Sequence, residues 1–222
     1  MPGDVLNRSM HANLTPETLV AAYTMGIFPM ADDTGIVRWV TADPRAVIEL
    51  DRFKVSRSLR TAVRRQVFEV TFNKAFAAVI DGCADRHEGT WISQEIKRAY
   101  RRLHRLGLAH SVESWRQGQL VGGLYGVALG GAFFGESMFH RATDASKVAL
   151  VHLVNRLRER RFALLDVQFM TEHLRQFGAV EIPAGVYRRR LDHALTLRCS
   201  FDNSPEEPAS ESPSQKGGTT HA

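Results

Sequence analysis

Residues 109–139 read AHSVESWRQGQLVGGLYGVALGGAFFGESMF. The stretch divides into three segments, 109–116, 119–129 and 132–139, of which the last two are rich in apolar residues. Gln117-Gly118 and Gly130-Gly131 separate them, and glycine between apolar runs is typical of tight hairpin turns. The stretch therefore predicts three consecutive antiparallel strands.

On both sides of this stretch, apolar periodicity predicts helices and further strands. A helix is expected over 93–106, because apolar residues recur at helical spacing and Gly107 can end it. Beyond the stretch we expect helices at about 144–160, 171–178 and 184–197, and strands at 162–169 and 179–182. Three meandering strands followed by alternating helices and strands predict an α/β fold, a mixed sheet covered by helices.

The N-terminal part predicts a helix followed by irregular chain. Thr15 and Pro16 suit the start of a helix that Gly26 can end. Residues 26–45 are rich in Gly, Pro and Asp and are interpreted as a loop. The elements expected after it are strands at 46–50 and 67–72, a basic helix at 57–65 and a helix capped by Asn73.

Composition excludes several classes of protein. The 222 residues are 44% hydrophobic and 24% charged, as in globular proteins, which excludes collagen-like, fully disordered and disulfide-scaffold classes. Two cysteines suit a reducing compartment. No apolar run approaches the roughly 20 residues of a membrane helix. We therefore expect a cytoplasmic protein with no membrane contact.

The net charge of +5 is unevenly distributed. Residues 202–222 contain no large aliphatic or aromatic side chain and are expected to be disordered. Without them 28 basic and 20 acidic residues remain, a formal charge of +8. Two clusters lack acidic residues, 97–105 and the group Arg57, Arg60, Arg64 and Arg65. They indicate either a phosphate-bearing partner or solvated helix faces.

Polar residues interrupt two apolar strands. Asp166 and Gln168 are two residues apart in FALLDVQF and so share a face. They are either a catalytic pair, with Asp166 orienting Gln168 or binding a cation, or a structural pair at a strand end. Glu136, in AFFGESMF, is either a binding group for a substrate amine or guanidinium, or a structural ion-pair partner. Trp91 precedes a helix and either stacks on a base or packs in the core.

Other catalytic and metal motifs are missing from the sequence. The histidines and cysteines have no metal-ligand spacing. GGLYGVALGG lacks the spacing and the Lys of a P-loop, and GxSxG does not occur. We expect neither a metal nor a cofactor.

Several motifs follow one another in a specific order. They are GIFPM, DPR, SRSLR, CADRHEGTWI, AYRRLHRLGLAHSVESW, LVGGLYGVALGGAFFGESMF, DASKVAL, LLDVQF and FGAVEIP. Over about residues 14–197 the chain resembles the leucyl/phenylalanyl-tRNA–protein transferase family. The resemblance implies a small N-terminal domain (1–42), a GNAT-like acyltransferase domain (43–201) and, outside the match, the disordered tail (202–222).

The resemblance also implies an activity. Members transfer Leu or Phe, and Met less well, from aminoacyl-tRNA to the N-terminal Arg or Lys of a protein, which marks it for degradation by the N-degron route. It implies that Asp166 and Gln168 act in catalysis and that Glu136 contributes to the active site. Trp91 and Tyr100 match residues near the aminoacyl-adenosine. The pocket for the donor side chain would include Leu124, Phe133, Met138, Leu150, Leu153 and Leu157.

The tRNA-binding residues implied by the resemblance are Arg57 and Arg60, with Arg64 and Arg65 in the same cluster. A monomer is expected. The chain has Met30 and Val40 where many members have tryptophan, so softer contacts would replace stacking at these positions.

Three alternatives remain open at this point. An acyl-CoA-dependent GNAT enzyme would need a glycine-containing pyrophosphate loop where this chain reads FHRATDASKVAL. A non-catalytic RNA-binding module explains the arginines but not the polar residues in apolar strands. A family member without activity is the third.

Overall fold

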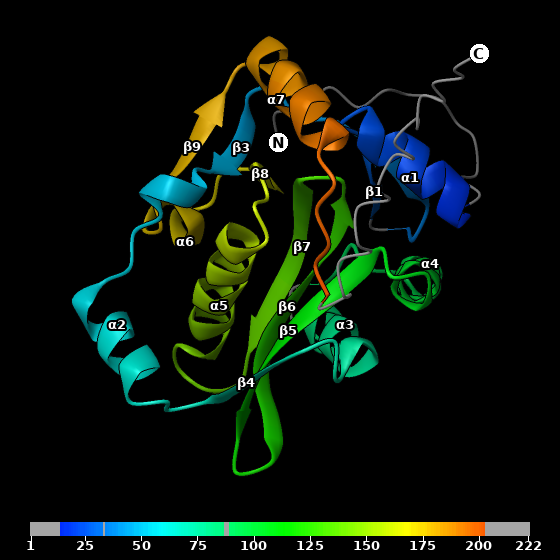
Figure 1. Cartoon of the computed structure of the whole chain (residues 1–222). Helices are drawn as coiled ribbons and strands as arrows, with labels where there is room; N and C mark the ends of the chain where they lie inside the picture. The colour runs from blue at the N-terminus through cyan, green and yellow to red at the C-terminus, as the bar shows by residue number, and fades with distance from the viewer. Residues whose placement is uncertain (1–13, 33, 87–88, 203–222) are drawn as a thin grey trace, which may run out of the picture.

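A computed structural model describes residues 14–32, 34–86 and 89–202. Its main sheet has the strand order β4-β5-β6-β7-β8-β3-β9 (Figure 1). The strands are β3 (Arg45–Ile48), β4 (Glu69–Phe72), β5 (Ala109–Arg116), β6 (Gln119–Leu129), β7 (Ala132–His140), β8 (Leu164–Gln168) and β9 (Ala179–Ile182). Neighbouring strands are antiparallel except β7 and β8, which are parallel. The mixed sheet and its three-stranded meander are confirmed.

Helices cover both faces of this sheet. The helices are α1 (Pro16–Thr24), α2 (Arg57–Arg64), α3 (Phe76–Ala84), α4 (Gln94–Arg105), α5 (Ala145–Glu159), α6 (Glu172–Arg175) and α7 (Ala184–Thr196), with a 3-10 turn at Leu50–Arg52. α5 lies across one face, against β5, β6 and β7, while α3 and α4 pack on the other (Figure 1). Each face has its own apolar core.

Two local features of β7 and β8 create the position of the site. Pairing between them ends at Phe134 and Asp166, so the two strands separate beyond these residues. β7 also has a bulge opposite β6, because Tyr125 pairs with Ser137 and Gly126 pairs with Gly135. Glu136 is the extra residue of this bulge, and bulges commonly redirect a side chain.

The interpretation of residues 26–45 as a loop is wrong. They contain a hairpin of β1 (Phe28–Ala31) and β2 (Val37–Val40), in which Pro29 pairs with Trp39. Asp32 stabilises the turn by accepting hydrogen bonds from the backbone N–H groups of Thr34 and Ile36. Proline in such a short strand argues against a strand by sequence alone, and edge strands are where proline is tolerated.

Helix caps follow the sequence at some positions and not at others. Thr15 caps its helix as expected, and Ser93 and Thr171 likewise accept hydrogen bonds from the backbone N–H groups of their helices. Asn73 does not cap α3, because its amide oxygen instead accepts the N–H of Ser111. Asp144 precedes α5 without a side-chain cap and forms an ion pair with Lys147.

Only part of the expected tail can be compared with the structure. Phe201 is 2% exposed and packs against His110 and Phe133, while Asp202 accepts a hydrogen bond from Asn73. Residues 203–222 lie outside the described residues, so disorder there stays a prediction, as do the expected domain boundaries. Within the described ranges, no helix is both long enough and apolar enough to cross a bilayer.

Candidate active site

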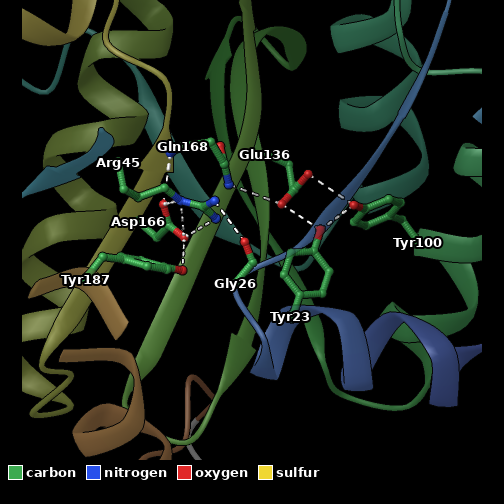
Figure 2. Close-up of polar contacts among 8 residues, drawn as sticks. All are labelled: Tyr23, Gly26, Arg45, Tyr100, Glu136, Asp166, Gln168 and Tyr187. Carbon is green, nitrogen blue, oxygen red and sulfur yellow. Dashed lines mark hydrogen bonds and ion pairs between the residues drawn. The ribbon is translucent and has the colours of Figure 1, made fainter. Parts of the chain in front are cut away.

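Glu136 lies at the centre of a group of tyrosines contributed by different helices (Figure 2). The hydroxyl of Tyr23, from α1, donates to Oε1 of Glu136 at 2.7 Å. The hydroxyl of Tyr100, from α4, donates to Oε2 at 3.1 Å. The two hydroxyl oxygens also lie within hydrogen-bond distance of each other, but each hydroxyl has one proton, so this bond does not form while both donate to an anionic Glu136. Helices on one side of the sheet therefore hold the carboxylate in a fixed orientation.

The protonation state of Glu136 is sensitive to pH near neutrality. Burial raises the pKa of Glu136 from 4.5 to about 7, and the hydrogen bonds from Tyr23 and Tyr100 oppose this rise. Burial and the nearby carboxylate raise the pKa of both tyrosines well above 10, so both remain protonated donors. Glu136 can therefore be neutral or anionic at a physiological pH.

Asp166 has a different environment from Glu136. It is 0% exposed and accepts bonds from Arg45 on both oxygens, from Nε to Oδ1 at 2.9 Å and from Nη2 to Oδ2 at 2.7 Å. Tyr187, from α7, donates to Oδ2 at 2.6 Å. Figure 2 shows the Arg45 guanidinium and the Tyr187 hydroxyl both reaching this carboxylate. Asp166 is thus fully engaged by protein donors.

Gln168 connects these two groups at the end of β8. Its backbone N–H donates to Oδ1 of Asp166 at 2.9 Å, and its φ of 56° lies in the left-handed region. Its Nε2 atom lies 3.5 Å from Oε1 of Glu136. The side chain therefore crosses the gap between β8 and β7 (Figure 2).

A cavity of about 460 Å³ lies where β7 and β8 separate. Apolar residues that line it on the α5 side are Leu124, Met138, Leu150, Leu153, Leu165 and Leu174. Those contributed from the other side are Phe28, Met30, Trp91, Tyr125 and Phe169. Glu136 and Gln168 are also part of its wall. A mainly apolar space thus meets a carboxylate and an amide at one point.

The structure places most, but not all, of the residues singled out by sequence on this cavity. Leu124, Met138, Leu150, Leu153, Trp91, Glu136 and Gln168 line it. Phe133 and Leu157 are each 0% exposed and belong to the core on the α5 side. Tyr100 and Asp166 are not part of the cavity wall. Tyr100 contacts Glu136, and Asp166 contacts Gln168. Of the two residues expected to make softer contacts in place of stacking, Met30 lines the cavity, whereas Val40 packs against the neighbouring core.

Sequence reasoning did not identify Tyr23, Arg45 and Tyr187. Tyr23 lies among the buried apolar residues of α1, and a tyrosine in that position is normally predicted to be part of the core. Arg45 belongs to the DPR motif, and its position beside an apolar strand is a signal that could have been used. Tyr187 carries no local signal, because its partner Asp166 is brought close only by the fold.

Two further polar features line the cavity. Arg86 donates from Nη2 to Ser137 at 2.9 Å, and both residues are part of the wall. The hydroxyl of Tyr125 is buried and has no hydrogen-bond partner among the described residues. Buried hydroxyls are usually satisfied, so this one is an exception within the described residues.

The arginines of α2, together with Arg65 directly after it, are called the α2 arginines and are not part of the cavity wall. Arg57, Arg60, Arg64 and Arg65 are exposed, and within the described residues none of them forms an ion pair. The cluster at 97–105 differs, because Lys97 and Arg101 both pair with Asp81 of α3. The α2 arginines are therefore the less neutralised of the two basic clusters.

The described residues offer no evident place for a metal ion. Within them, no group of three or more His, Cys, Asp or Glu side chains is arranged to hold one.

Two solved structures show distant similarity. A ribosomal-protein-alanine N-acetyltransferase from Brucella melitensis matches 44% of this chain and 76% of its own length, at 16% identity and a TM-score of 0.34. L-PGS from Bacillus licheniformis matches 72% of this chain and 55% of its own, at 16% identity and a TM-score of 0.38.

Sequence similarity to known proteins is much stronger. A leucyl/phenylalanyl-tRNA–protein transferase from Rubrobacter xylanophilus is 59% identical over 85% of this chain and 98% of its own. One from Gloeobacter violaceus is 58% identical over 86% of this chain and its full length. The family model for leucyl/phenylalanyl-tRNA protein transferase matches residues 47–192, and the model for its N-terminal domain matches 12–43. The chain belongs to the leucyl/phenylalanyl-tRNA–protein transferase family.

Proposed function

We propose that this protein transfers Leu or Phe, and Met less well, from aminoacyl-tRNA to the N-terminal Arg or Lys of acceptor proteins. The observation that carries the proposal is the meeting of Glu136 and Gln168 at the edge of a mainly apolar cavity in a member of this family. The transfer would mark the acceptor for degradation by the N-degron route. A cytoplasmic monomer remains the expectation from sequence.

The reaction is the aminolysis of an ester. The acceptor α-amine forms a bond with the ester carbonyl carbon, and the bond from that carbon to the ribose oxygen breaks. The leaving ribose oxygen takes a proton from the neighbouring ribose hydroxyl. That hydroxyl in turn takes the proton that the amine loses, so the protons balance. The ester is already activated, so no ATP is consumed. An α-amine has a pKa near 8, so a useful fraction is neutral at pH 7, and positioning can supply much of the rate.

Gln168 is proposed to position the amine. Its Nε2 is directed at Glu136, which leaves its Oε1 as the atom that accepts a hydrogen bond from the attacking N–H. An amide is a poor base, so its contribution is orientation. Asp166 supports Gln168 by accepting its backbone N–H and is not part of the cavity wall.

Glu136 is proposed to select the cationic side chain of the acceptor. The sequence also allows Asp166 to bind a cation, but Arg45 already occupies both of its oxygens. Glu136 lines the cavity, and its surrounding donors are neutral tyrosines. An anionic Glu136 would therefore favour Arg or Lys over neutral residues.

The apolar wall on the α5 side is proposed to hold the donor side chain. Leu124, Met138, Leu150 and Leu153 form part of it. Discrimination by apolar contact is worth only about 1–3 kcal/mol per methylene. Selection among Leu, Phe and Met should thus be graded.

The direct test uses labelled Leu-tRNA or Phe-tRNA with peptides that begin with Arg, Lys or Ala. Transfer to Arg and Lys peptides and not to the Ala peptide is expected. Transfer to none of them refutes the proposal, and acetyl transfer from acetyl-CoA to the same peptides would favour the acyl-CoA alternative.

A matched pair of glutamine variants tests the role of Gln168. Gln168→Ala should lower the single-turnover rate at saturating substrates. Gln66 is exposed and has a similar left-handed φ of 49°, so Gln66→Ala controls for loss of a glutamine in this conformation. Equal rates for the two variants would contradict the assignment.

A further inference from the structure

Arg45 is a buried cation that no part of the proposed reaction yet uses. It is 0% exposed, and its guanidinium carbon lies 4.8 Å from the ring centroid of Phe28 and 4.6 Å from that of Tyr187. Burying a guanidinium is costly unless its donors are paired. The fold therefore holds a buried cation next to Asp166, whose neighbour Gln168 is part of the cavity wall.

The donors of Arg45 are directed at two specific acceptors. Nε and Nη2 form a two-pronged pair with Asp166, and Nη1 donates to the carbonyl oxygen of Gly26 at 2.9 Å. Gly26 follows α1 with a φ of +75°, and a Cβ there would lie 2.8 Å from the Tyr187 ring. Arg45 thus joins the turn after α1 to the carboxylate on β8 (Figure 2).

Asp166 connects Arg45 to Gln168 through hydrogen bonds to both residues. Oδ1 of Asp166 accepts both the Nε of Arg45 and the backbone N–H of Gln168, each at 2.9 Å. A non-glycine residue at φ 56° is held in a sparsely populated conformation and needs surrounding contacts to stay there. The regular extended backbone of β8 would not turn the Gln168 amide toward Glu136 in the same way.

We propose that Arg45 is a positioning residue for the transfer, acting through Asp166 to hold Gln168 in its left-handed conformation. This inference rests on the proposed function and adds a residue to its machinery. Arg45 touches no substrate, and Asp166 serves as the acceptor that connects Arg45 to Gln168. Because Gly26 shares the same guanidinium, the turn after α1 is part of the support for the site.

The main test is a double-mutant cycle. Arg45→Lys keeps a positive charge but loses the two-pronged geometry. It should lower the single-turnover rate by about 10- to 100-fold while the dissociation constant for aminoacyl-tRNA changes less than about twofold. In a Gln168→Ala background the same substitution should change the rate less than about twofold, because coupled residues are non-additive.

Two outcomes overturn the proposal. One is an unchanged rate for Arg45→Lys in the wild-type background. The other is the same fold-loss in both backgrounds, which would mean that Arg45 acts independently of Gln168. If Arg45→Lys does not fold, Tyr187→Phe removes one hydrogen bond from Asp166 and leaves Arg45 in place, so the same cycle is measured with it.

A second readout does not depend on transfer activity. Hydrogen exchange at the Gln168 backbone N–H should accelerate in Arg45→Lys, because the acceptor of that N–H is Asp166. The N–H of Gly131, which bonds to the carbonyl of Ala194, is the control and should be unchanged. Unchanged exchange at Gln168 refutes the positioning role, whereas absent wild-type transfer refutes only the proposed function.

Discussion

The Nε2 atom of Gln168 and the Oε1 atom of Glu136 lie 3.5 Å apart, across the gap that opens where β7 and β8 stop pairing. The bulge in β7 brings the carboxylate to this gap, and the left-handed backbone of Gln168 brings the amide. Two departures from regular strand geometry thus meet at one point. The charge of Glu136 and the orientation of Gln168 are therefore linked.

The first prediction concerns the pH dependence of transfer. The pKa of Glu136 is about 7, and its anionic form is proposed to attract the acceptor cation. For an Arg peptide, kcat/KM should therefore rise as pH increases through about 7, before the further rise from the α-amine near pH 8. In Glu136→Gln only the later rise should remain.

The control for this measurement is Glu69→Gln on β4. Glu69 is an exposed carboxylate outside the cavity, so its variant should retain both rises. If Glu136→Gln keeps the inflection near pH 7, Glu136 does not select the acceptor through its charge.

The second prediction concerns stability, and its sign follows from the same group. The pKa of Glu136 is raised from 4.5 to about 7 on folding, so the folded protein binds more protons than the unfolded chain between these values. The contribution of Glu136 to the free energy of unfolding should therefore fall by about 3 kcal/mol as pH rises across this window.

Denaturant unfolding of wild type and Glu136→Gln at pH 4.5, 6 and 7.5 measures this effect. The variant should gain stability relative to wild type as pH rises, because it cannot lose the proton. A difference between the two proteins that is constant with pH would show that the Glu136 carboxyl has an ordinary pKa.

The sequence predicts both the sheet and the polar residues of the site, because both leave local signals. Glycine turns between successive segments are a local signal, so the meander at 109–139 could be predicted directly. Glu136, Asp166 and Gln168 stood out because a polar side chain in an apolar strand is costly unless it is satisfied. Their proximity at one gap is a property of the parallel β7–β8 pair.

The partners of these residues could not be predicted, because their roles arise only in three dimensions. Tyr23 and Tyr187 lie on helix faces that look like ordinary core. Arg45 is the last residue of the stretch interpreted as a loop, where an arginine is normally solvated. The hairpin within that stretch escaped detection because its strands have four residues each and one contains Pro29.

The third prediction separates the cavity wall from the core on one helix. Leu150 and Leu157 both lie on α5 and are 2% and 0% exposed, but only Leu150 lines the cavity. Leu150→Ala should increase the preference for Phe over Leu by about 10-fold in kcat/KM, because it enlarges the donor space. Leu157→Ala should leave that ratio unchanged and lower the free energy of unfolding by about 2–5 kcal/mol.

The measurement is competition between Leu-tRNA and Phe-tRNA for one acceptor peptide, with folded fraction checked by circular dichroism. Equal shifts in donor preference for both variants would mean that the α5 side of the cavity does not hold the donor side chain.

The fourth prediction concerns binding of tRNA. The arginines of α2 are exposed and form no ion pair within the described residues, so they are free to contact phosphates. Affinity for tRNA should then fall steeply as salt concentration rises. Protein binding releases salt cations that are condensed on the phosphates, and this release is less favourable at higher salt concentration. Arg60→Ala should weaken binding and reduce the slope of log affinity against log salt by about one.

Arg189→Ala is the matched control, because Arg189 is an exposed arginine on α7 and its loss changes the net charge by the same amount. Its slope should equal that of wild type if phosphate contact, rather than overall charge, determines the salt dependence. Equal slopes for Arg60→Ala and wild type would leave α2 as a solvated helix face. The tRNA would then have to be bound by other cations, of which Arg98 and Arg105 on α4 are exposed candidates.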